Sequence, residues 1–354
     1  MNLIENKIVK EDIANIIKSN IEWNKLKNKT IIVTGSNGFF GKYFIATLIK
    51  LNEEKKLNIS ILALVRSLDK NSWLSKVSKI HKRLELVASD LGKDEIKINK
   101  DINFIFHIAS NASPKFYSSD PVGTILPNTI GTNNLLKLLH KSKNPDSFIF
   151  ISSSEIYGSS DTHKELKELD MGVIDPMSIR SCYAESKRCG ENLCVSWSHQ
   201  YNLSTKVIRP FHTYGPGLKE NDGRVFADFA YDINSNRDII MKSDGKARRS
   251  FCYITDAIEG IFMVAINGKS SEAYNLANPN GDMSIHELAT MLVDLFPEKN
   301  LSVKIQDEHL KIINSKFNEL KPSIEKISDL GWIPKIAPNE GFYRMIKSLE
   351  EPFQ

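Results

Sequence analysis

A glycine-rich turn between an apolar run and a helical pattern constrains the fold of this chain more than any other feature. The apolar run ends at Thr34, Gly35, Gly38 and Gly41 follow at three-residue spacing, and a helical pattern continues over 39–52. In such a turn the first glycine permits the tight bend, the second lets backbone approach a pyrophosphate, and the third lets the helix pack on the strand. The free N–H groups of the helix N-terminus then face the phosphates. The turn therefore predicts a dinucleotide-binding unit.

Strand-like and helical patterns alternate after this turn. Strand-like runs cover 31–34, 59–65, 84–88, 104–109, 148–152 and 205–209, and helical patterns cover 39–52, 124–141 and 184–200. This alternation predicts an α/β fold with a Rossmann-type, doubly wound parallel sheet. We expect a helical N-terminal extension over 1–28, a dinucleotide-binding domain over 29–210 to which later segments return, and a smaller, interrupted region over 211–354 that mainly binds substrate.

Composition limits the classes of partner. The net charge is +4 over 354 residues, and the short basic stretches at 25–29 and 55–56 indicate solvated surface rather than a nucleic-acid site. No apolar run approaches the about 18 residues of a membrane span, and the N-terminus is polar, so we expect neither a membrane segment nor a signal peptide. The four cysteines lack metal-site spacing. These features predict free thiols, no bound metal and a cytoplasmic location.

Tyr183 and Lys187 form the second informative pattern. Four residues apart on a helix, they share one face, so an ammonium group lies near a phenol. A neighbouring cation favours the phenolate, which can accept a hydroxyl proton while a hydride leaves the same carbon. A Tyr-x-x-x-Lys pair is common on helices by chance, but Ser153 and the upstream glycine-rich turn accompany it here. Together they predict hydride transfer with a nicotinamide cofactor.

These motifs resemble the extended short-chain dehydrogenase/reductases that modify nucleotide sugars, over roughly residues 28–345. The resemblance implies that Ser153, Tyr183 and Lys187 oxidise the C4 hydroxyl of the sugar, and that Asp90 touches adenine. NAD is the implied cofactor, bound tightly and regenerated in each cycle. The full set of implied cofactor contacts is Gly35, Asn37, Gly38, Phe39, Phe40, Gly41, Arg66, Asp90, Leu91, Ala109, Tyr183 and Lys187.

The segment after Ser153 separates the subfamilies. Sugar-nucleotide 4,6-dehydratases usually carry Asp-Glu at the next two positions, and simple C4 epimerases lack both carboxylates, whereas this chain has Ser154 and Glu155. That pair, with Arg180-Ser-Cys-Tyr183 and Arg249-Ser-Phe, is similar to the UDP-glucuronate decarboxylases. The resemblance implies that Glu155 and Arg249 handle loss of the carboxylate and protonation at C5. Its implied substrate contacts are Tyr117, Ser154, His212, Arg224, Val225 and Arg249.

Departures from the decarboxylase pattern keep other functions open. His212 stands where the decarboxylases carry an asparagine that meets the diphosphate, and Arg66 stands where an aspartate for the ribose is expected. Arg66 fits either a 2′-phosphate or stacking on adenine, and NAD remains the first choice. A C4 epimerase, a 4,6-dehydratase and a redox-sensing binding protein stay as alternatives.

The resemblance also implies a homodimer built from the helices near 124–141 and 183–199. Apolar side chains line one face of each helix. These faces form either the dimer contact or intramolecular core, and they carry Leu135, Leu136, Leu139, Leu193, Val195 and Trp197.

Overall fold

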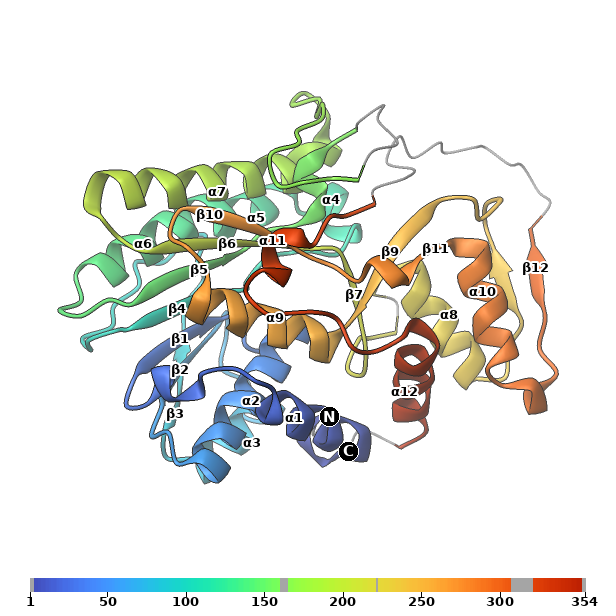
Figure 1. Ribbon diagram of the computed structural model, residues 1–354, viewed down its shortest axis with the longest axis horizontal. Coiled ribbons are helices and arrows are strands. Elements are labelled where there is room, and N and C mark those ends of the chain that lie inside the picture. The colour runs from blue at the N-terminus through green and yellow to red at the C-terminus, as the bar shows by residue number, and fades with distance from the viewer. Residues whose placement is uncertain (1–2, 160–164, 221, 307–320, 352–354) are drawn as a thin grey trace.

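The computed structural model describes residues 3–159, 165–220, 222–306 and 321–351. A seven-stranded sheet lies at its centre, in the order β10-β6-β5-β4-β1-β2-β3, and every neighbouring pair is parallel (Figure 1). This sheet confirms the predicted α/β fold. The strands are β1 (Thr30–Thr34), β2 (Ser60–Val65), β3 (Leu84–Ala88), β4 (Phe104–His107), β5 (Ser147–Ile151), β6 (Thr205–Pro210) and β10 (Glu272–Leu276).

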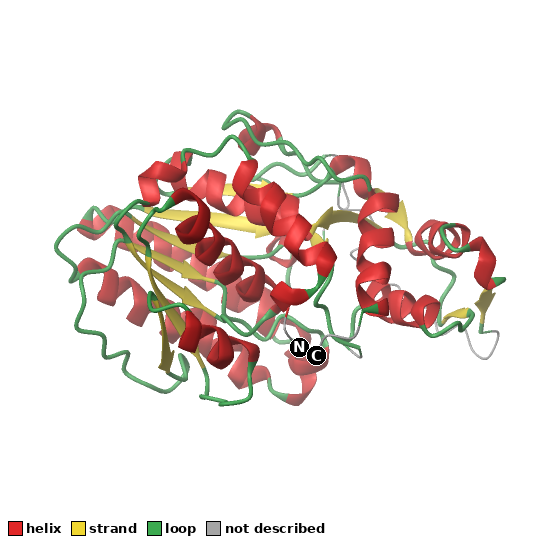
Figure 2. Ribbon diagram, turned by 90° about the horizontal axis from the view of Figure 1, so that it is seen from below, coloured by secondary structure: helices red, strands yellow, loops and turns green. Residues whose placement is uncertain are grey.

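Helices cover both faces of this sheet, as Figure 2 shows. On one face, α1 (Lys7–Lys18), α2 (Phe39–Lys55), α3 (Trp73–Ile80) and α9 (Ile254–Asn267) bury their apolar side chains in the larger core cluster. On the other, α6 (Thr132–His140) and α7 (Cys182–Tyr201) pack on a second cluster, with α5 (Pro121–Leu126) beside α7. The sheet is therefore doubly wound, as predicted.

Strand β1 shows why these segments read as continuous apolar runs. Its residues Ile31 and Val33 are buried in the larger cluster, whereas Ile32 is buried in the cluster on the opposite face. Successive side chains of a strand point to opposite faces. A parallel sheet covered on both faces therefore needs apolar residues at consecutive positions.

The region beyond residue 210 forms a smaller unit on the right of Figure 1. In it, β9 (Arg248–Tyr253) is the central strand between β7 (His212–Tyr214) and β11 (Asp282–Ser284). Strands β8 (Ile239–Met241) and β12 (Val303–Ile305) form a parallel pair. The helices here are α8 (Val225–Asn234), α10 (Ile285–Asp294) and α12 (Pro338–Glu350), and the short α11 (Glu325–Ser328) contacts β10. Two later elements, α9 and β10, return to the main sheet.

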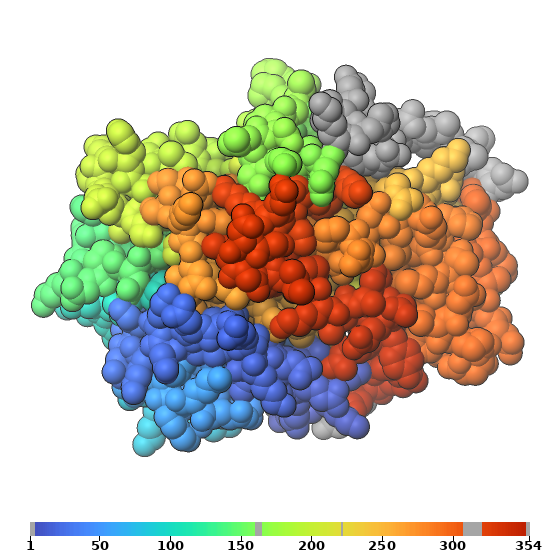
Figure 3. All heavy atoms as spheres, viewed as in Figure 1, coloured from blue at the N-terminus to red at the C-terminus, as the bar shows by residue number. Residues whose placement is uncertain are grey.

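The N-terminal extension is part of the core. It contains α1 and two short 3-10 turns, Leu3–Glu5 and Trp23–Leu26. Four apolar residues of α1 are buried in the larger cluster, namely Val9, Ile13, Ile16 and Ile17. The surfaces of the N-terminal and C-terminal segments meet in Figure 3. Between these segments, the side-chain amide of Asn6 donates to the Ser348 carbonyl at 3.1 Å.

The described residues also show the state of the cysteines and contain neither a metal-binding cluster nor a membrane-spanning helix. The four cysteines, at positions 182, 189, 194 and 252, are free. Within the same ranges, no three His, Cys, Asp or Glu side chains gather in a way that would hold a metal ion. No helix in the described part of the chain combines the length and the apolar character needed to cross a membrane.

Candidate active site

The glycine-rich turn lies between β1 and α2 and leaves no room for side chains. Gly35 has φ +66°, and a Cβ there would lie 2.8 Å from the Ala109 Cα. A Cβ on Gly41 would lie 2.2 Å from the Gly35 carbonyl oxygen. Gly38 is the N-cap of α2, so the free N–H groups of that helix begin at the turn. Bare backbone next to a helix N-terminus fits the pyrophosphate of a dinucleotide.

A buried hydrogen-bond network joins this turn to β4, the neighbour of β1 in the sheet. The hydroxyl of Thr34 donates to His107 Nδ1 at 2.8 Å, and His107 Nε2 donates to the Pro127 carbonyl at 3.0 Å. The Thr34 oxygen accepts the Ile108 and Ala109 N–H groups, each at 3.0 Å. Burial, with a smaller effect of Lys187, lowers the pKa of His107 to about 3, so the ring is neutral and can accept at Nδ1. The network fixes the ends of β1 and β4 beside the turn.

The other expected cofactor residues lie at neighbouring strand ends. Asn37 is exposed, Phe39 and Phe40 are half-buried, and Arg66 is exposed just after β2, where it donates to Asn111 at 3.3 Å. Asp90 follows β3, and its carboxylate accepts the Gly92 N–H at 3.1 Å. The Leu91 side chain is buried in the smaller core cluster. All of these residues follow the carboxyl ends of β1, β2 and β3.

Replacing Gly41 by alanine tests the cradle. In Gly41→Ala the new methyl group overlaps the Gly35 carbonyl, and backbone must move to accommodate it. We expect a loss of about 1–3 kcal/mol in the free energy of unfolding, typical of overpacking. We also expect less dinucleotide to copurify with the protein. Thermal unfolding and cofactor release on denaturation measure the two effects, and Lys50→Ala on the same helix is the control. Unchanged cofactor content would contradict the assignment of the turn.

The catalytic pair expected on α7 is buried below the end of β5. Lys187 Nζ donates to the Ile151 carbonyl at 2.6 Å and lies 5.7 Å from the centre of the Tyr183 ring. Ser153 follows β5, and its oxygen accepts the Glu155 N–H at 3.1 Å. Burial raises the pKa of Tyr183, and Glu155 raises it further, whereas the hydrogen bond with Ser153 opposes the rise. The pKa of this phenol is therefore raised rather than lowered as the pairing with Lys187 predicted, because burial is the largest effect.

The buried lysine gives a pH-dependent prediction. Burial lowers the pKa of Lys187 from 10.5 to about 7. Between these values the unfolded chain holds the proton that the folded chain releases, so this group makes the wild type more stable as pH rises. Lys187→Met lacks the titrating group. The melting temperature of Lys187→Met minus that of the wild type should be largest at or below pH 7 and fall toward pH 10.5. A difference that grows with pH in thermal scans would contradict this assignment.

Glu155 is held by two side chains beside Tyr183. Arg180 donates to one carboxylate oxygen at 2.9 Å, and the Tyr117 hydroxyl donates to the other at 3.3 Å. Tyr117 stacks on Tyr183 with ring centres 5.0 Å apart, and the Arg180 guanidinium lies 4.4 Å from the Tyr117 ring centre. Sequence reasoning quoted Arg180 within a motif but gave it no role. Its position three residues before Tyr183 was the available signal.

A cavity of about 370 Å³ opens beside this cluster. It receives residues from the turn after β5, from the start of α8 and from β9, which are far apart in the sequence. Tyr117 is buried behind the cavity and is not among its lining residues. The lining includes the expected Ser154, Glu155, His212, Arg224, Val225 and Arg249, together with Arg180, Phe226 and Arg248.

Positive charge dominates the cavity, and Glu155 is the acidic residue in its lining. Arg224 pairs with Asp222, and Arg248 pairs with Asp282 at 3.1 Å. Burial lowers the pKa of Arg249, and nearby Glu155 opposes this effect. Burial, Arg249 and Arg224 lower the pKa of His212 to about 3, so its ring is neutral. Such a cavity favours an anionic ligand.

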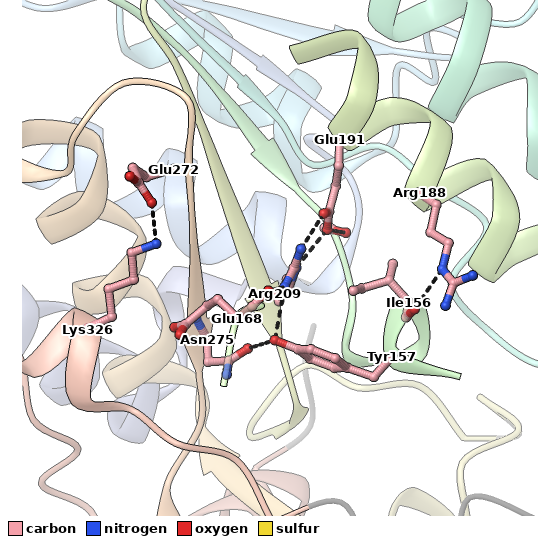
Figure 4. Close-up of polar contacts among 10 residues, drawn as sticks. Ile156, Tyr157, Glu168, Arg188, Glu191, Arg209, Glu272, Asn275 and Lys326 are labelled. Atoms are coloured by element: carbon pink, nitrogen blue, oxygen red, sulfur yellow. Dashed lines mark hydrogen bonds and ion pairs between the residues drawn. The ribbon is translucent and has the colours of Figure 1, made fainter. Parts of the chain in front are cut away.

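A second hydrogen-bond network includes residues on both sides of the Ser153–Glu155 turn, and Figure 4 shows its members Arg209, Glu191, Tyr157 and Asn275. Arg209, at the end of β6, donates to Glu191 of α7 at 2.6 Å and to the Tyr157 hydroxyl at 3.0 Å. The Tyr157 hydroxyl donates to Asn275 of β10 at 2.5 Å, and the Ser152 hydroxyl donates to Glu191 at 2.5 Å. The network therefore ties the turn to β6, α7 and β10.

The chain is similar to known proteins. The family described as NAD dependent epimerase/dehydratase matches residues 31–277. UDP-glucuronic acid decarboxylase 6 of Arabidopsis thaliana is 31% identical over 332 residues, which cover 92% of this chain and 89% of that protein.

Two solved structures share the fold. UDP-N-acetylglucosamine 4-epimerase from Methanobrevibacter ruminantium M1 has a TM-score of 0.76 at 24% identity, covering 92% of this chain and 99% of its own. UDP-glucuronic acid 4-epimerase from Bacillus cereus, solved with UDP-glucuronic acid and NAD, has a TM-score of 0.75 at 22% identity, covering 92% of this chain and all of its own. The chain therefore belongs to the NAD-dependent epimerase/dehydratase family, and NAD is its cofactor.

Proposed function

We propose that this enzyme oxidises the C4 hydroxyl of a UDP-linked uronate and then decarboxylates it, converting UDP-glucuronate to a UDP-pentose of the UDP-xylose type. The observation that carries the proposal is the placement of Glu155 and Arg249 in one cationic cavity. Tyr183 is linked to that cavity through Tyr117, because it stacks on the Tyr117 ring whose hydroxyl donates to Glu155. The similarity to a UDP-glucuronic acid decarboxylase over most of the chain supports the same reading.

The first half of the reaction belongs to Ser153 and Tyr183. Bound NAD would supply the hydride acceptor and later the hydride donor, and the positive charge of its oxidised form would favour the Tyr183 phenolate against the effect of burial. Tyr183 takes the proton of the C4 hydroxyl as the hydride leaves C4, and the Ser153 hydroxyl donates a hydrogen bond to the C4 oxygen. Since the Ser153 oxygen already accepts the Glu155 N–H, its own proton is free to face the sugar. The buried Lys187 holds the Ile151 carbonyl next to Ser153.

The second half removes the carboxylate. A C4 ketone makes the uronate a β-keto acid, so the C5–C6 bond breaks, CO₂ leaves, and the electron pair passes into the C4 carbonyl. Arg249 pairs with the carboxylate and orients it until the ketone has formed. Glu155 then takes a proton from solvent and passes it to C5 through a water molecule, while Arg180 and Tyr117 hold its two oxygens. The hydride then returns from the reduced cofactor to C4, and Tyr183 returns its proton to the C4 oxygen, which completes the pentose.

A substrate panel tests this assignment against epimerisation and dehydration. Purified enzyme is incubated with UDP-glucuronate, UDP-glucose, UDP-N-acetylglucosamine and dTDP-glucose, and the products are separated by chromatography before their masses are measured. We expect UDP-glucuronate alone to lose the mass of CO₂. Loss of water from a neutral hexose nucleotide would indicate a dehydratase. Conversion of any substrate at unchanged mass would indicate an epimerase, and either result would replace the proposal.

We propose that the enzyme works as a homodimer. The helical faces expected to pair are mostly internal, because Leu135, Leu136 and Leu139 are buried in the smaller core cluster and Leu193 and Trp197 pack against it. A different apolar surface remains. It forms a groove of about 420 Å³ between α5, α7 and the segment 176–179, which the exposed Met177 and Ile179 line. The exposed Val122 and Ile130 are the sequence neighbours of its lining residues Pro121 and Thr129.

Light scattering tests the dimer. We expect twice the chain mass of 40.1 kDa at micromolar concentration. Ile130→Asp should shift the mass toward one chain, because it places a charge on the exposed apolar surface. Ile80→Asp, an exposed apolar residue of α3 on the opposite face of the sheet, is the control. A wild-type monomer would contradict the proposal.

A further inference from the structure

Asp12 of the N-terminal extension is a buried hydrogen-bond hub. Its side chain is 2% exposed. One carboxylate oxygen accepts the hydroxyls of Tyr43, at 3.1 Å, and Tyr253, at 2.8 Å. The other accepts two Arg344 N–H groups, at 3.2 and 2.7 Å. Four donors therefore converge on a carboxylate that lies far from the reacting groups in the sequence.

The three partners of Asp12 belong to both halves of the site. Tyr43 lies on α2, the helix that begins at the cofactor turn. Tyr253 is the last residue of β9, and Arg249 of the cavity lies near the start of that strand. Arg344 lies on α12, which packs against α8 and β9. The hub thus connects the cofactor half, the central strand of the substrate half and the C-terminal helix.

Helix α12 transmits this contact to the cavity wall. A Cβ on Gly341 would lie 2.2 Å from the Tyr214 hydroxyl, so the helix sits against β7 at the closest distance that glycine allows. Phe342 stacks on Tyr214 with ring centres 3.9 Å apart, and its ring centre lies 5.6 Å from that of Phe251. Phe251 in turn contacts Phe226, which lines the cavity, at 5.6 Å. Displacement of α12 would therefore move the wall of the cavity.

We propose that Asp12 is a positioning residue, and that the N-terminal extension uses it to hold β9 and α12 in register with α2, so that Arg249 keeps its place relative to the cofactor turn. Apolar contacts between the cofactor half and the substrate half allow small shifts of one half relative to the other. A carboxylate with four directional hydrogen bonds instead specifies one relative position of the two halves. The test of this proposal by activity rests on the proposed function, so a second measurement that needs no turnover accompanies it.

Asp12→Asn tests the hub. The amide keeps the shape but replaces one acceptor with a donor and removes the charge facing Arg344. At assay temperatures below the melting temperature of the variant, we expect kcat/KM for UDP-glucuronate to fall about 10- to 100-fold. This is the scale for a small misplacement of a catalytic group. Bound NAD per chain should stay unchanged, because the turn itself is intact. Tyr253→Phe, a milder change on the β9 side, should lower kcat/KM in the same direction. Glu11→Gln, which removes the other carboxylate near Arg344 at 3.4 Å, is the matched control and should have no effect.

Hydrogen exchange of the holoenzyme gives the second readout. Amides of β9 should exchange faster in Asp12→Asn and Tyr253→Phe than in the wild type, while amides of α7 stay the same. A lower melting temperature with unchanged kcat/KM and unchanged β9 exchange would overturn the proposal, since Asp12 would then only stabilise the fold. If the wild type fails to convert UDP-glucuronate, the proposed function fails instead, and the exchange of β9 still decides the role of Asp12.

Discussion

Tyr183→Phe should lower turnover of UDP-glucuronate by about 10²–10⁴-fold, the range for a positioned acid–base group. In the proposed mechanism Tyr183 takes the C4 proton, whereas the buried Lys187 donates its hydrogen bond to the Ile151 carbonyl. Phenylalanine keeps the stacking on Tyr117. The variant should therefore fold normally and retain NAD, and its loss should appear in kcat rather than in cofactor content.

Tyr201→Phe is the matched control for this change. Tyr201 lies at the end of the same helix, is 43% exposed, and its hydroxyl accepts a hydrogen bond from Gln200. Its removal should leave turnover unchanged. Near-full activity in Tyr183→Phe, measured by product formation over time, would remove Tyr183 from the mechanism.

Glu155→Gln should separate the two halves of the reaction. Glutamine keeps the length of the side chain and an acceptor for Arg180, but it cannot carry a proton to C5. We expect CO₂ release to slow by about 10²-fold, again the scale of general acid–base catalysis. Oxidation at C4, followed as the absorbance of reduced cofactor in a single turnover, should slow much less. Reduced cofactor should therefore accumulate in the variant.

The control for Glu155→Gln is Glu22→Gln, because the exposed Glu22 carboxylate pairs with Lys25 at 3.1 Å and lies outside the lining of the cavity. It should change neither step. Equal slowing of C4 oxidation and CO₂ release in Glu155→Gln would assign Glu155 to holding the substrate or the site as a whole rather than to C5 chemistry.

The sequence predicted the cofactor half of the fold well because its signals are local. The six predicted strands from β1 to β6 lie where apolar runs indicated them, since strands covered on both faces need consecutive apolar residues. The edge strand β10 was not predicted. Its sequence, Glu272-Ala-Tyr-Asn-Leu276, mixes apolar and polar residues without a regular period, and its place beside β6 depends on contacts formed only in the folded chain.

The site was predictable where spacing along one element decides it. Tyr183 and Lys187 share a helix, and Ser153 through Glu155 follow one strand, so a motif reveals them. The partnership of Glu155 with Arg180 and Tyr117 was not visible, because it joins three separate elements. The same holds for Asp12, whose partners lie up to 332 residues away in the chain. Long-range polar contacts leave no periodic pattern in the sequence.

Release of labelled CO₂ from UDP-glucuronate tests the central claim most directly. The substrate carries carbon-13 at C6, and the purified holoenzyme is assayed without added cofactor. We expect one labelled CO₂ for each UDP-pentose formed, with the label absent from the sugar product. Return of the label in an intact UDP-uronate, whether unchanged or inverted at C4, would contradict the decarboxylase account.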